Sequence, residues 1–343
     1  MLEQSDIAHY LLSLNVVKPR AILDEDFTVV DASRRNCVYL VTTRSGPTFV
    51  VKQALAGDGA ALAHEADILR LLAGAAELAP HLPAVVHLDP VGACLVLRTP
   101  GGARDWSDHQ GRFARIPARI LGRTLAALHR LRADDVPDAS IWGLLLPEPP
   151  HELVLGLSAG AQDLVARIQA SEYVCQRLGE LSDARGGSAV VHGDLRWENC
   201  LALPAPGARR RTRVLLVDWE LAGRADPAVD VGSVLAEYLR VWVGSVPIVE
   251  PVDPGRLVAR ARHPLAAMRP AIDAFWSAYR HANPELALRR VMELAAVRLL
   301  QTAVERAQGL NAPSAHVVTL VQLADNMLRR PEAAALGLLG LRA

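Results

Sequence analysis

The sequence predicts an α+β fold in two parts: a small antiparallel sheet with one main helix, then a larger, mostly helical part. Three observations lead to this prediction. Strand-like runs joined by close turns are concentrated before residue 100, runs with helical spacing of apolar residues dominate after it, and a proline-glycine cluster separates the two. With 343 residues, 51% of them hydrophobic, the chain is long enough to bury a sizeable core in two lobes.

The first part alternates short apolar runs with polar turns. Two of these turns join three runs so closely that they favour an antiparallel meander. One long segment with helical spacing then separates the meander from two further strand-like runs. We expect these elements to form an N-terminal lobe, residues 1–99. In chain order they are a helix near 2–14, strands at 27–32, 37–43 and 48–53, a helix at 58–78, and two strands within 85–99.

The second part begins with the sequence PGGA at residues 100–103, and we expect a hinge at Arg98 to Gly102. Helical spacing dominates beyond this point, and strand patterns return only around 189–218. We therefore expect a helical C-terminal lobe, residues 100–343. Its clearest helical stretches are residues 114–132, 153–181 and 286–308.

Composition and charge exclude several classes of protein. The chain carries 37 basic and 37 acidic residues, so no net charge recruits nucleic acid or an anionic membrane. Its four cysteines form no CxxC pair, which argues against a zinc site or a disulfide framework. The N-terminal segment lacks the features of a signal peptide or a membrane span. These observations predict a cytoplasmic protein with reduced thiols.

A polar motif stands between two apolar runs in the second part. Residues 192–199 read HGDLRWEN, CLAL follows directly, and a later run, RVLLV, ends at Asp218. If these two runs pair antiparallel across the turn between them, their outer ends lie about 4.8 Å apart. Asn199 and Asp218 occupy those ends, and Asp194 precedes them in the loop. Two carboxylates and an amide oxygen suit a hard cation such as Mg²⁺ better than zinc.

One lysine is notable because lysine is so rare in this chain. Of the 37 basic residues only Lys18 and Lys52 are lysine. Lys52 falls on the third strand of the expected meander, and Glu65 falls on the helix that follows. A basic residue on a third strand, a glutamate on the next helix, HxDxxxxN, and a strand ending in aspartate is the order of parts in kinase-type phosphoryl transfer.

The stretch from VVHGDLRWENCL to VDWELAGRADPAVDVG resembles the aminoglycoside phosphotransferase and choline kinase group of the protein-kinase-like fold. The signature of that group is similar to HGDxxxxN, a strand, [IV]D[WF] and GDPxxDL. The resemblance implies a bilobal, protein-kinase-like fold that binds ATP and Mg²⁺ and transfers phosphate to a hydroxyl. In this interpretation residues 1–99 bind the nucleotide, and 190–200 and 214–232 form the catalytic loop and the metal-binding segment.

The resemblance also implies a role for each matching position. Asp194 is expected to accept or orient the proton of the attacking hydroxyl. Arg196, where Ser/Thr protein kinases carry a lysine, is expected to neutralise charge on the transferring phosphoryl group. Asn199 and Asp218 are expected to hold Mg²⁺. Lys52, oriented by Glu65, is expected to contact the α- and β-phosphates. His192 and Asp230 are expected to brace the catalytic loop.

Two features depart from the protein-kinase pattern. No GxGxxG occurs between the first two strands, where the turn reads DASRRN. Phosphate binding is therefore expected from Ser33, Asn36 and backbone N–H groups, helped by Arg34 or Arg35. The metal motif reads Asp-Trp-Glu in place of DFG, so no DFG-type switch is expected.

Several positions also have a simpler structural interpretation. Lys52 is either the phosphate contact or a solvent-facing strand lysine, and Glu65 is either its partner or one of several exposed helix carboxylates, with Asp67 nearby. Arg196 either contacts phosphate or forms a salt bridge with a neighbouring carboxylate. His129 is expected in a core or capping role, and Trp197, Trp219 and Cys200 are expected to pack. The Arg209 to Arg213 cluster is either a solvated hairpin tip or a binding site for an acidic peptide or phosphate.

The expected activity is ATP-dependent phosphate transfer to a small-molecule hydroxyl, such as that of an aminoglycoside-like compound or an amino alcohol. Glu237, Glu250 and Asp253 either attract a cationic acceptor or are surface residues. Two alternatives stay open. The acceptor is a Ser or Thr of a peptide in natural-product (RiPP or lanthipeptide-type) biosynthesis, or the protein is a catalytically silent nucleotide-binding scaffold.

Overall fold

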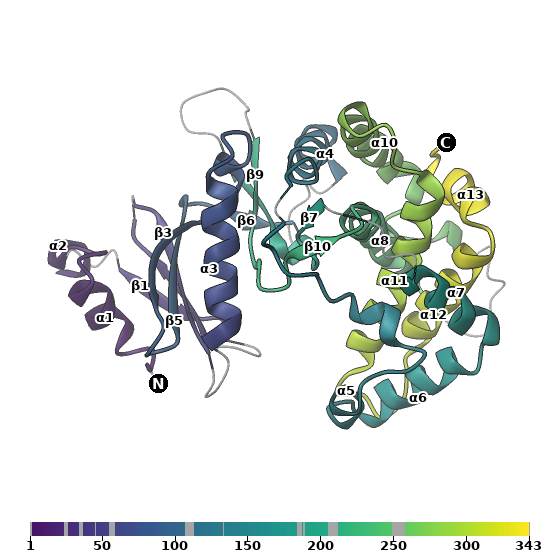
Figure 1. Ribbon diagram of the computed structural model, residues 1–343, viewed down its shortest axis with the longest axis horizontal. Helices are drawn as coiled ribbons and strands as arrows, with labels where there is room; N and C mark the ends of the chain where they lie inside the picture. The colour runs from purple at the N-terminus through teal and green to yellow at the C-terminus, as the bar shows by residue number, and fades with distance from the viewer. Residues whose placement is uncertain are drawn as a thin grey trace. The chain divides into compact units, whose positions relative to one another are not determined.

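A computed structural model describes residues 2–23, 27–33, 37–44, 46–54, 59–106, 113–132, 134–183, 187, 189–204, 212–248 and 258–342. The chain divides into two compact units (Figure 1). Unit 1 comprises Met1–Gly111 with Trp197–Ala222, and unit 2 comprises Arg112–Arg196 with Gly223–Ala343. The boundary between the units therefore falls inside the HGDLRWEN motif, between Arg196 and Trp197.

Unit 1 contains a five-stranded antiparallel sheet with strand order β1-β2-β3-β5-β4. The expected meander is confirmed, because β1 pairs with β2 and β2 with β3. The strands are β1 (Thr28–Asp31), β2 (Cys37–Thr42), β3 (Thr48–Gln53), β4 (Ala84–Asp89) and β5 (Cys94–Thr99), and the helices are α1 (Ile7–Ser13), α2 (Pro19–Leu23) and α3 (Gly59–Ala73). The expected helix at 58–78 ends early, at Ala73, where Gly74 follows.

The alternation of side chains along β3 divides the unit into two layers. Phe49 and Val51 point to the face where they pack with Ile7 and Leu11 of α1. The next residue, Lys52, points to the opposite face, where it meets Glu65 of α3. Figure 1 shows α1 and α3 on opposite sides of the sheet. The sheet therefore buries one apolar face under α1 and presents its lysine to α3.

The rest of unit 1 is a three-stranded sheet with order β6-β8-β9, made of β6 (Arg104–Asp105), β8 (Cys200–Pro204) and β9 (Thr212–Leu216). A 3₁₀ turn, η4 (Trp197–Asn199), leads into β8. Two histidines tie this part of the chain to the first part of the unit. The His81 ring lies 2.7 Å from the carbonyl oxygen of Val214 in β9, and the His64 ring lies 2.7 Å from that of Ala222, beyond the end of β9. Residues far apart in the sequence are thus held in one unit.

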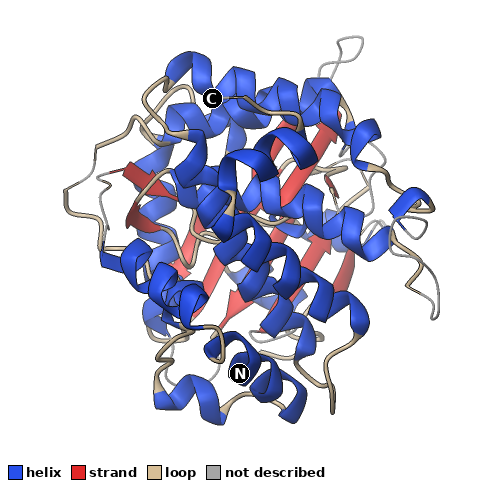
Figure 2. Ribbon diagram, turned by 90° about the vertical axis from the view of Figure 1, so that its right-hand side faces the viewer, coloured by secondary structure: helices blue, strands red, loops and turns tan. Residues whose placement is uncertain are grey.

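Unit 2 is mostly helical, as Figure 2 shows from the side of its C-terminal helices. Its helices are α4 (Arg115–Leu128), α5 (His151–Leu155), α6 (Ala159–Gln169), α7 (Glu172–Asp183), α8 (Ala228–Ser245), α10 (Leu265–Ala282), α11 (Leu288–Ala307), α12 (Ala315–Arg329) and α13 (Pro331–Ala334). The expected single stretch at 153–181 is wrong, because it is divided among α5, α6 and α7. Ser158 starts α6 as an N-cap whose hydroxyl accepts the Ala161 N–H, and this cap favours a new helix over continuation.

One strand of a short pair in unit 2 lies directly before the HGDLRWEN motif. β7 (Ala189–Val191) pairs antiparallel with β10 (Gly223–Ala225), and HGD follows β7 directly. α8 and α11 approach each other closely at Gly232, where an added Cβ would lie 2.7 Å from the Ala295 backbone nitrogen. Asp230 of α8 and Arg298 of α11 contact the loop that follows β7.

In the described residues, no helix is both long enough and apolar enough to span a bilayer.

Candidate functional site

Lys52 lies between two carboxylates inside unit 1. Its Nζ donates to both oxygens of Glu65, at 2.9 and 2.7 Å, and to Oδ1 of Asp218 at 2.6 Å. Glu65 Oε1 also accepts the backbone N–H of Trp219 at 3.2 Å. Glu65 therefore fixes both the lysine and the residue that follows Asp218.

The burial of this cluster excludes the solvent-exposed interpretation of Lys52 and Glu65. Lys52 is 7% exposed and Glu65 is fully buried, so neither lies on a solvated face. The nearby Asp67 is exposed and pairs with Arg70. Burial favours a lower pKa for Lys52, but the carboxylates of Glu65 and Asp218 outweigh it and raise the pKa to about 12. The lysine is a fixed cation at neutral pH.

The hairpin of β8 and β9 places Asn199 and Asp218 as the sequence predicts. Cys200 pairs with Leu216, and the Val217 N–H donates to the Asn199 carbonyl at 3.0 Å, so the two outer ends lie side by side. Asp218 has a φ of 70°, a left-handed conformation that is uncommon for residues other than glycine. Such conformations cost free energy and gather at functional sites. This turn aims the Asp218 carboxylate at Lys52.

Asn199 and Asp218 have the right chemistry for magnesium. Among the described residues, no three His, Cys, Asp or Glu side chains gather closely enough to hold a metal ion. Mg²⁺, however, commonly takes only one or two protein oxygens and completes its shell with phosphates and water. An amide oxygen and a carboxylate at adjacent strand ends fit that pattern, and the metal role of these two residues stays a prediction.

Asp230 holds the backbone at the start of the HGDLRWEN motif, within unit 2. Its carboxylate accepts the N–H groups of His192 at 2.7 Å and Gly193 at 3.1 Å. Gly193 has a φ of 80°, which explains the glycine between His192 and Asp194. Burial raises the pKa of Asp230, but hydrogen bonds and charge from His129 and His192 outweigh it, so the pKa lies below its usual range. The contacts that a bracing role requires are present.

His129 extends this network into the core. It is the C-cap residue of α4 and is buried, with Nε2 3.1 Å from Asp230 Oδ2 and Nδ1 2.8 Å from the Tyr279 hydroxyl. This is the core and capping position that the sequence suggests. Trp197, Trp219 and Cys200 are also buried, as expected of packing residues, and all four cysteines are free thiols.

Two arginines hold the side chain of Asp194. Oδ1 of Asp194 lies 2.7 Å from Nη2 of Arg196 and 3.0 Å from Nη2 of Arg298 on α11. Arg196 also lies 3.3 Å from Glu305, so it forms salt bridges with carboxylates. Burial raises the pKa of Asp194, but Arg298 and then Arg196 outweigh it, so the pKa lies below its usual range. Asp194 is therefore ionised at neutral pH.

Arg298 and Glu305 are site residues that sequence reasoning missed. They lie in the segment predicted only as an amphipathic helix at 286–308, which the structure confirms as α11. Helical spacing shows which residues share a face, but not which turn of that face meets the catalytic loop. The one available signal is that polar residues interrupt a largely buried helix at Arg298 and Glu305.

Other predicted residues lie apart from these clusters or outside the described residues. The Ser33 hydroxyl accepts the Val38 N–H at 3.0 Å, so it closes the turn between β1 and β2. Glu237 is buried and pairs with Arg240 at 2.6 Å, so it is not a surface carboxylate. The predicted residues that lie outside the described part of the chain are Arg34, Arg35, Asn36, Arg209, Arg210, Arg211, Glu250 and Asp253.

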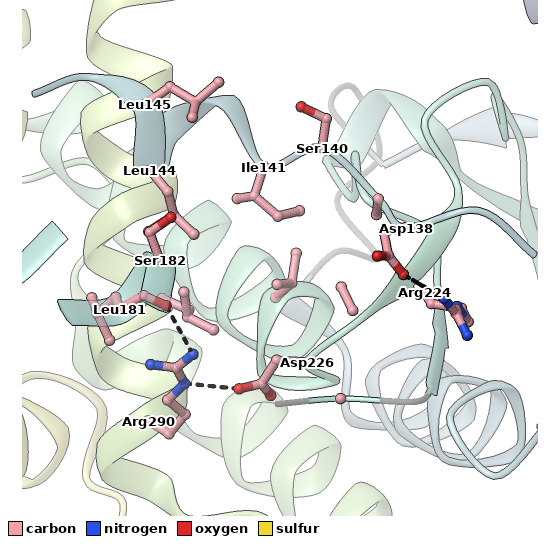
Figure 3. Close-up of a pocket in the computed structure, with 15 residues that line it drawn as sticks. Asp138, Ser140, Ile141, Leu144, Leu145, Leu181, Ser182, Arg224, Asp226 and Arg290 are labelled. Atoms are coloured by element: carbon pink, nitrogen blue, oxygen red, sulfur yellow. Dashed lines mark hydrogen bonds and ion pairs between the residues drawn. The ribbon is translucent and has the colours of Figure 1, made fainter. Parts of the chain in front are cut away.

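A cavity of about 130 Å³ lies in unit 2 between α11, α8 and the segment before α5 (Figure 3). Its walls include Ile141, Leu144 and Leu181, and Figure 3 shows two ion pairs beside them. These pairs are Arg290 with Asp226 at 2.7 Å and Arg224 with Asp138 at 2.9 Å. Each arginine is paired with an aspartate, so the cavity has a mixed wall of apolar side chains and paired charges.

The sheet, the helical unit and the two clusters define a kinase-like phosphotransferase fold. The chain belongs to the phosphotransferase enzyme family, whose profile matches residues 26–275. Viomycin phosphotransferase from Streptomyces vinaceus is 44% identical over 59 residues, which are 17% of this chain and 20% of that enzyme. The alignment thus spans about a fifth of that relative's length.

Solved structures of kinases share the fold over most of the chain. An ethanolamine kinase from Plasmodium vivax superposes with a TM-score of 0.58 at 11% identity, covering 92% of this chain and 85% of that one. A choline/ethanolamine kinase family protein from Mesorhizobium loti gives 0.55 at 18% identity, covering 96% of both chains. The ADP-bound aminoglycoside phosphotransferase APH(2'')-Ib gives 0.54 at 13% identity, covering 95% and 99%. The predicted protein-kinase-like α+β fold is confirmed.

Proposed function

We propose that this protein is an ATP-dependent phosphotransferase that transfers the γ-phosphate to a hydroxyl of a small-molecule acceptor. The observation that carries the proposal is the buried contact of Lys52 with Glu65 and Asp218, because it holds one compact ammonium where nucleotide phosphates are bound in kinases. Residues 1–99 are assigned to the nucleotide, with a hinge at Arg98 to Gly102. The helices after residue 231 are assigned to the acceptor.

The residues of unit 1 serve the nucleotide. When bound, Mg²⁺ neutralises phosphate charge and polarises the transferred group. Asn199 and Asp218 hold it through an amide and a carboxylate oxygen. Lys52 contacts the α- and β-phosphates, and Glu65 keeps the ammonium in place. Ser33 and Asn36 are assigned to the phosphates through the turn between β1 and β2.

The residues of unit 2 serve the acceptor. The acceptor oxygen attacks the γ-phosphorus, the bond from phosphorus to the bridging oxygen of ADP breaks, and the hydroxyl proton passes to Asp194. An ionised Asp194 can orient the hydroxyl and then take its proton, a contribution of about 10²- to 10⁴-fold. His192 and Asp230 hold the loop, and Arg196 neutralises charge on the transferring group.

The names of related proteins support a small acceptor. They refer to viomycin, ethanolamine, choline and aminoglycosides, and each is a small molecule or a class of them. An aminoglycoside-like compound or an amino alcohol is therefore the first choice. Glu237 is already neutralised by Arg240, so it adds no uncompensated negative charge for a cationic acceptor.

An acceptor screen tests this proposal. The protein is incubated with MgATP and aminoglycosides, amino alcohols or Ser/Thr-containing peptides, and phosphorylated products are identified by mass spectrometry. The expected result is a phosphorylated small molecule whose formation requires Mg²⁺ and stops in Asp194→Ala. Transfer to peptides alone would replace the acceptor assignment, and MgATP binding without turnover on any acceptor would replace the enzyme by a nucleotide-binding scaffold.

A further inference from the structure

α11 presents a row of polar side chains to the catalytic loop. Arg298, Gln301 and Glu305 are three and then four residues apart, which places them on one face of the helix. Arg298 contacts Asp194 directly at 3.0 Å. Glu305 accepts from Gln301 at 3.0 Å and lies 3.3 Å from Arg196, which in turn contacts Asp194. The helix thus reaches Asp194 by one direct and one indirect route.

Fold stability does not explain a buried arginine at this position. The Arg298 side chain is only 6% exposed, and its Nε has no hydrogen-bond partner among the residues that the structure describes. Burying a guanidinium group and leaving one N–H unsatisfied costs free energy. Buried ion pairs can often be replaced by apolar side chains without loss of stability. What an apolar side chain would not provide here is the contact with Asp194.

One small cavity borders Arg298 in the described residues. Arg298, Gly193, Ser233 and Gln301 line a cavity of about 10 Å³, roughly the room that one water molecule needs. The larger cavity of Figure 3 shares three of its walls, Ile141, Val229 and Leu294, but it is not lined by Arg298. Within the described residues, the charged partner of Arg298 is therefore the catalytic loop.

We propose that Arg298 is a positioning residue that holds the Asp194 carboxylate where it receives the acceptor hydroxyl. This inference rests on the proposed function. Arg196 belongs to the same loop as Asp194 and moves with it, whereas Arg298 is carried by a helix packed against α8. A reacting group held by a rigid element keeps its geometry better than one held by its own loop. Asp230 fixes the backbone of the loop, and Arg298 fixes the side chain.

Three variants test this role by kinetics, with an acceptor that the screen identifies. Arg298→Met keeps the length of the side chain and removes its charge and donors, and kcat is expected to fall about 10- to 100-fold because the carboxylate loses its position. KM for ATP is expected to stay near that of the wild type, whereas the melting temperature is expected to fall, because Asp194 keeps only Arg196 as a close charged partner. Arg298→Lys is expected to recover part of kcat. The matched control is Arg289→Met, an exposed arginine on the same helix that pairs with Glu293.

Crystal structures of the wild type and Arg298→Met give a readout that does not depend on turnover. The Asp194 carboxylate is expected to shift or to occupy more than one conformer in the variant. An unmoved Asp194, or an unchanged kcat, overturns the inference. If Arg298→Met melts early, Arg298→Lys is used for the same comparison. A wild-type protein without any transfer refutes the proposed function, while the pair of structures still decides whether Arg298 positions Asp194.

Discussion

The ammonium of Lys52 lies 2.9 and 2.7 Å from the two carboxylate oxygens of Glu65. Lys52 lies on the central strand β3, and Glu65 lies on α3, which covers the face of the sheet opposite to α1. Both residues are buried. Glu65 additionally accepts the N–H of Trp219, the residue after Asp218. Glu65 is therefore the group on which the placement of both Lys52 and the residue next to Asp218 depends.

Replacing Glu65 by glutamine tests that dependence. In Glu65→Gln the buried lysine loses one of its two carboxylates, and its ammonium is no longer fixed for the nucleotide phosphates. We expect kcat/KM for ATP to fall about 10²-fold, similar to the loss of one preorganised electrostatic contact. Steady-state kinetics with ATP varied, together with calorimetric titration of MgATP, measure the effect.

The matched control is Asp67→Asn on the same helix. Asp67 is exposed and pairs only locally with Arg70, a type of contact that contributes little. This variant is expected to bind and turn over ATP like the wild type. Equal losses in the two variants would show that any carboxyl-to-amide change on α3 has the same effect, and the special role of Glu65 would be rejected.

Asp218→Asn separates the metal role from the fold. Asparagine also accepts the left-handed conformation found at Asp218, so the backbone need not change. The substitution replaces a charged magnesium ligand by a neutral amide oxygen, and transfer is expected to fall at least about 10²- to 10³-fold. Product formation and thermal melting are measured in parallel. Near wild-type transfer by a folded variant would mean that Asp218 does not hold the metal.

Local sequence patterns were sufficient to predict the positions of the groups that lie in or beside short strands. Lys52 belongs to a strand and Asp218 lies just beyond the end of one, and the turns next to both strands are visible in the sequence. Period-2 alternation places Lys52 on the α3 side of the sheet. The antiparallel pairing of β8 with β9 places Asn199 beside the end of β9. The position of Glu65 followed from the order of parts, although its burial did not.

The contact of Arg298 with Asp194 could not be predicted in this way. Helical periodicity identifies the buried face of α11, but the turn that meets the catalytic loop depends on how α11 packs on α8. That packing depends on the close approach at Gly232, which no local pattern reveals. The breaks between α5, α6 and α7 were missed for another reason, since the Ser158 cap lies within a run that otherwise reads as helical.

The buried carboxylates predict how stability changes with pH. The pKa values of Asp194 and Asp230 lie below the ordinary 3.8 in the folded protein. Each group therefore stabilises the fold above pH 3.8, and this contribution is lost as the pH falls through the lowered folded-state pKa. We expect the free energy of unfolding to be level near neutral pH and to fall steeply in acid. Urea denaturation followed by circular dichroism over a pH series measures it.

Asp230→Asn provides the comparison for this pH dependence. The variant lacks the carboxylate that accepts the N–H groups of His192 and Gly193, so it is expected to be less stable at neutral pH. Its stability should also fall less steeply in acid, because one of the two titrating groups is gone. Parallel curves for the variant and the wild type would show that Asp230 does not contribute to acid unfolding.

Gly232→Ala tests whether the packing of α8 on α11 supports the site. The added Cβ would lie 2.7 Å from the Ala295 nitrogen and 2.9 Å from the Val291 carbonyl oxygen, and both are backbone atoms that cannot turn away. The helices must separate, at a cost of about 1–3 kcal/mol, and Arg298 moves with α11. Gly244→Ala on the same helix is the control, since nothing lies within 4 Å of its added Cβ. Chemical denaturation should show Gly232→Ala destabilised and Gly244→Ala unchanged or slightly more stable, because alanine favours the helix. The packing argument does not survive if both alanines have the same effect on stability and transfer.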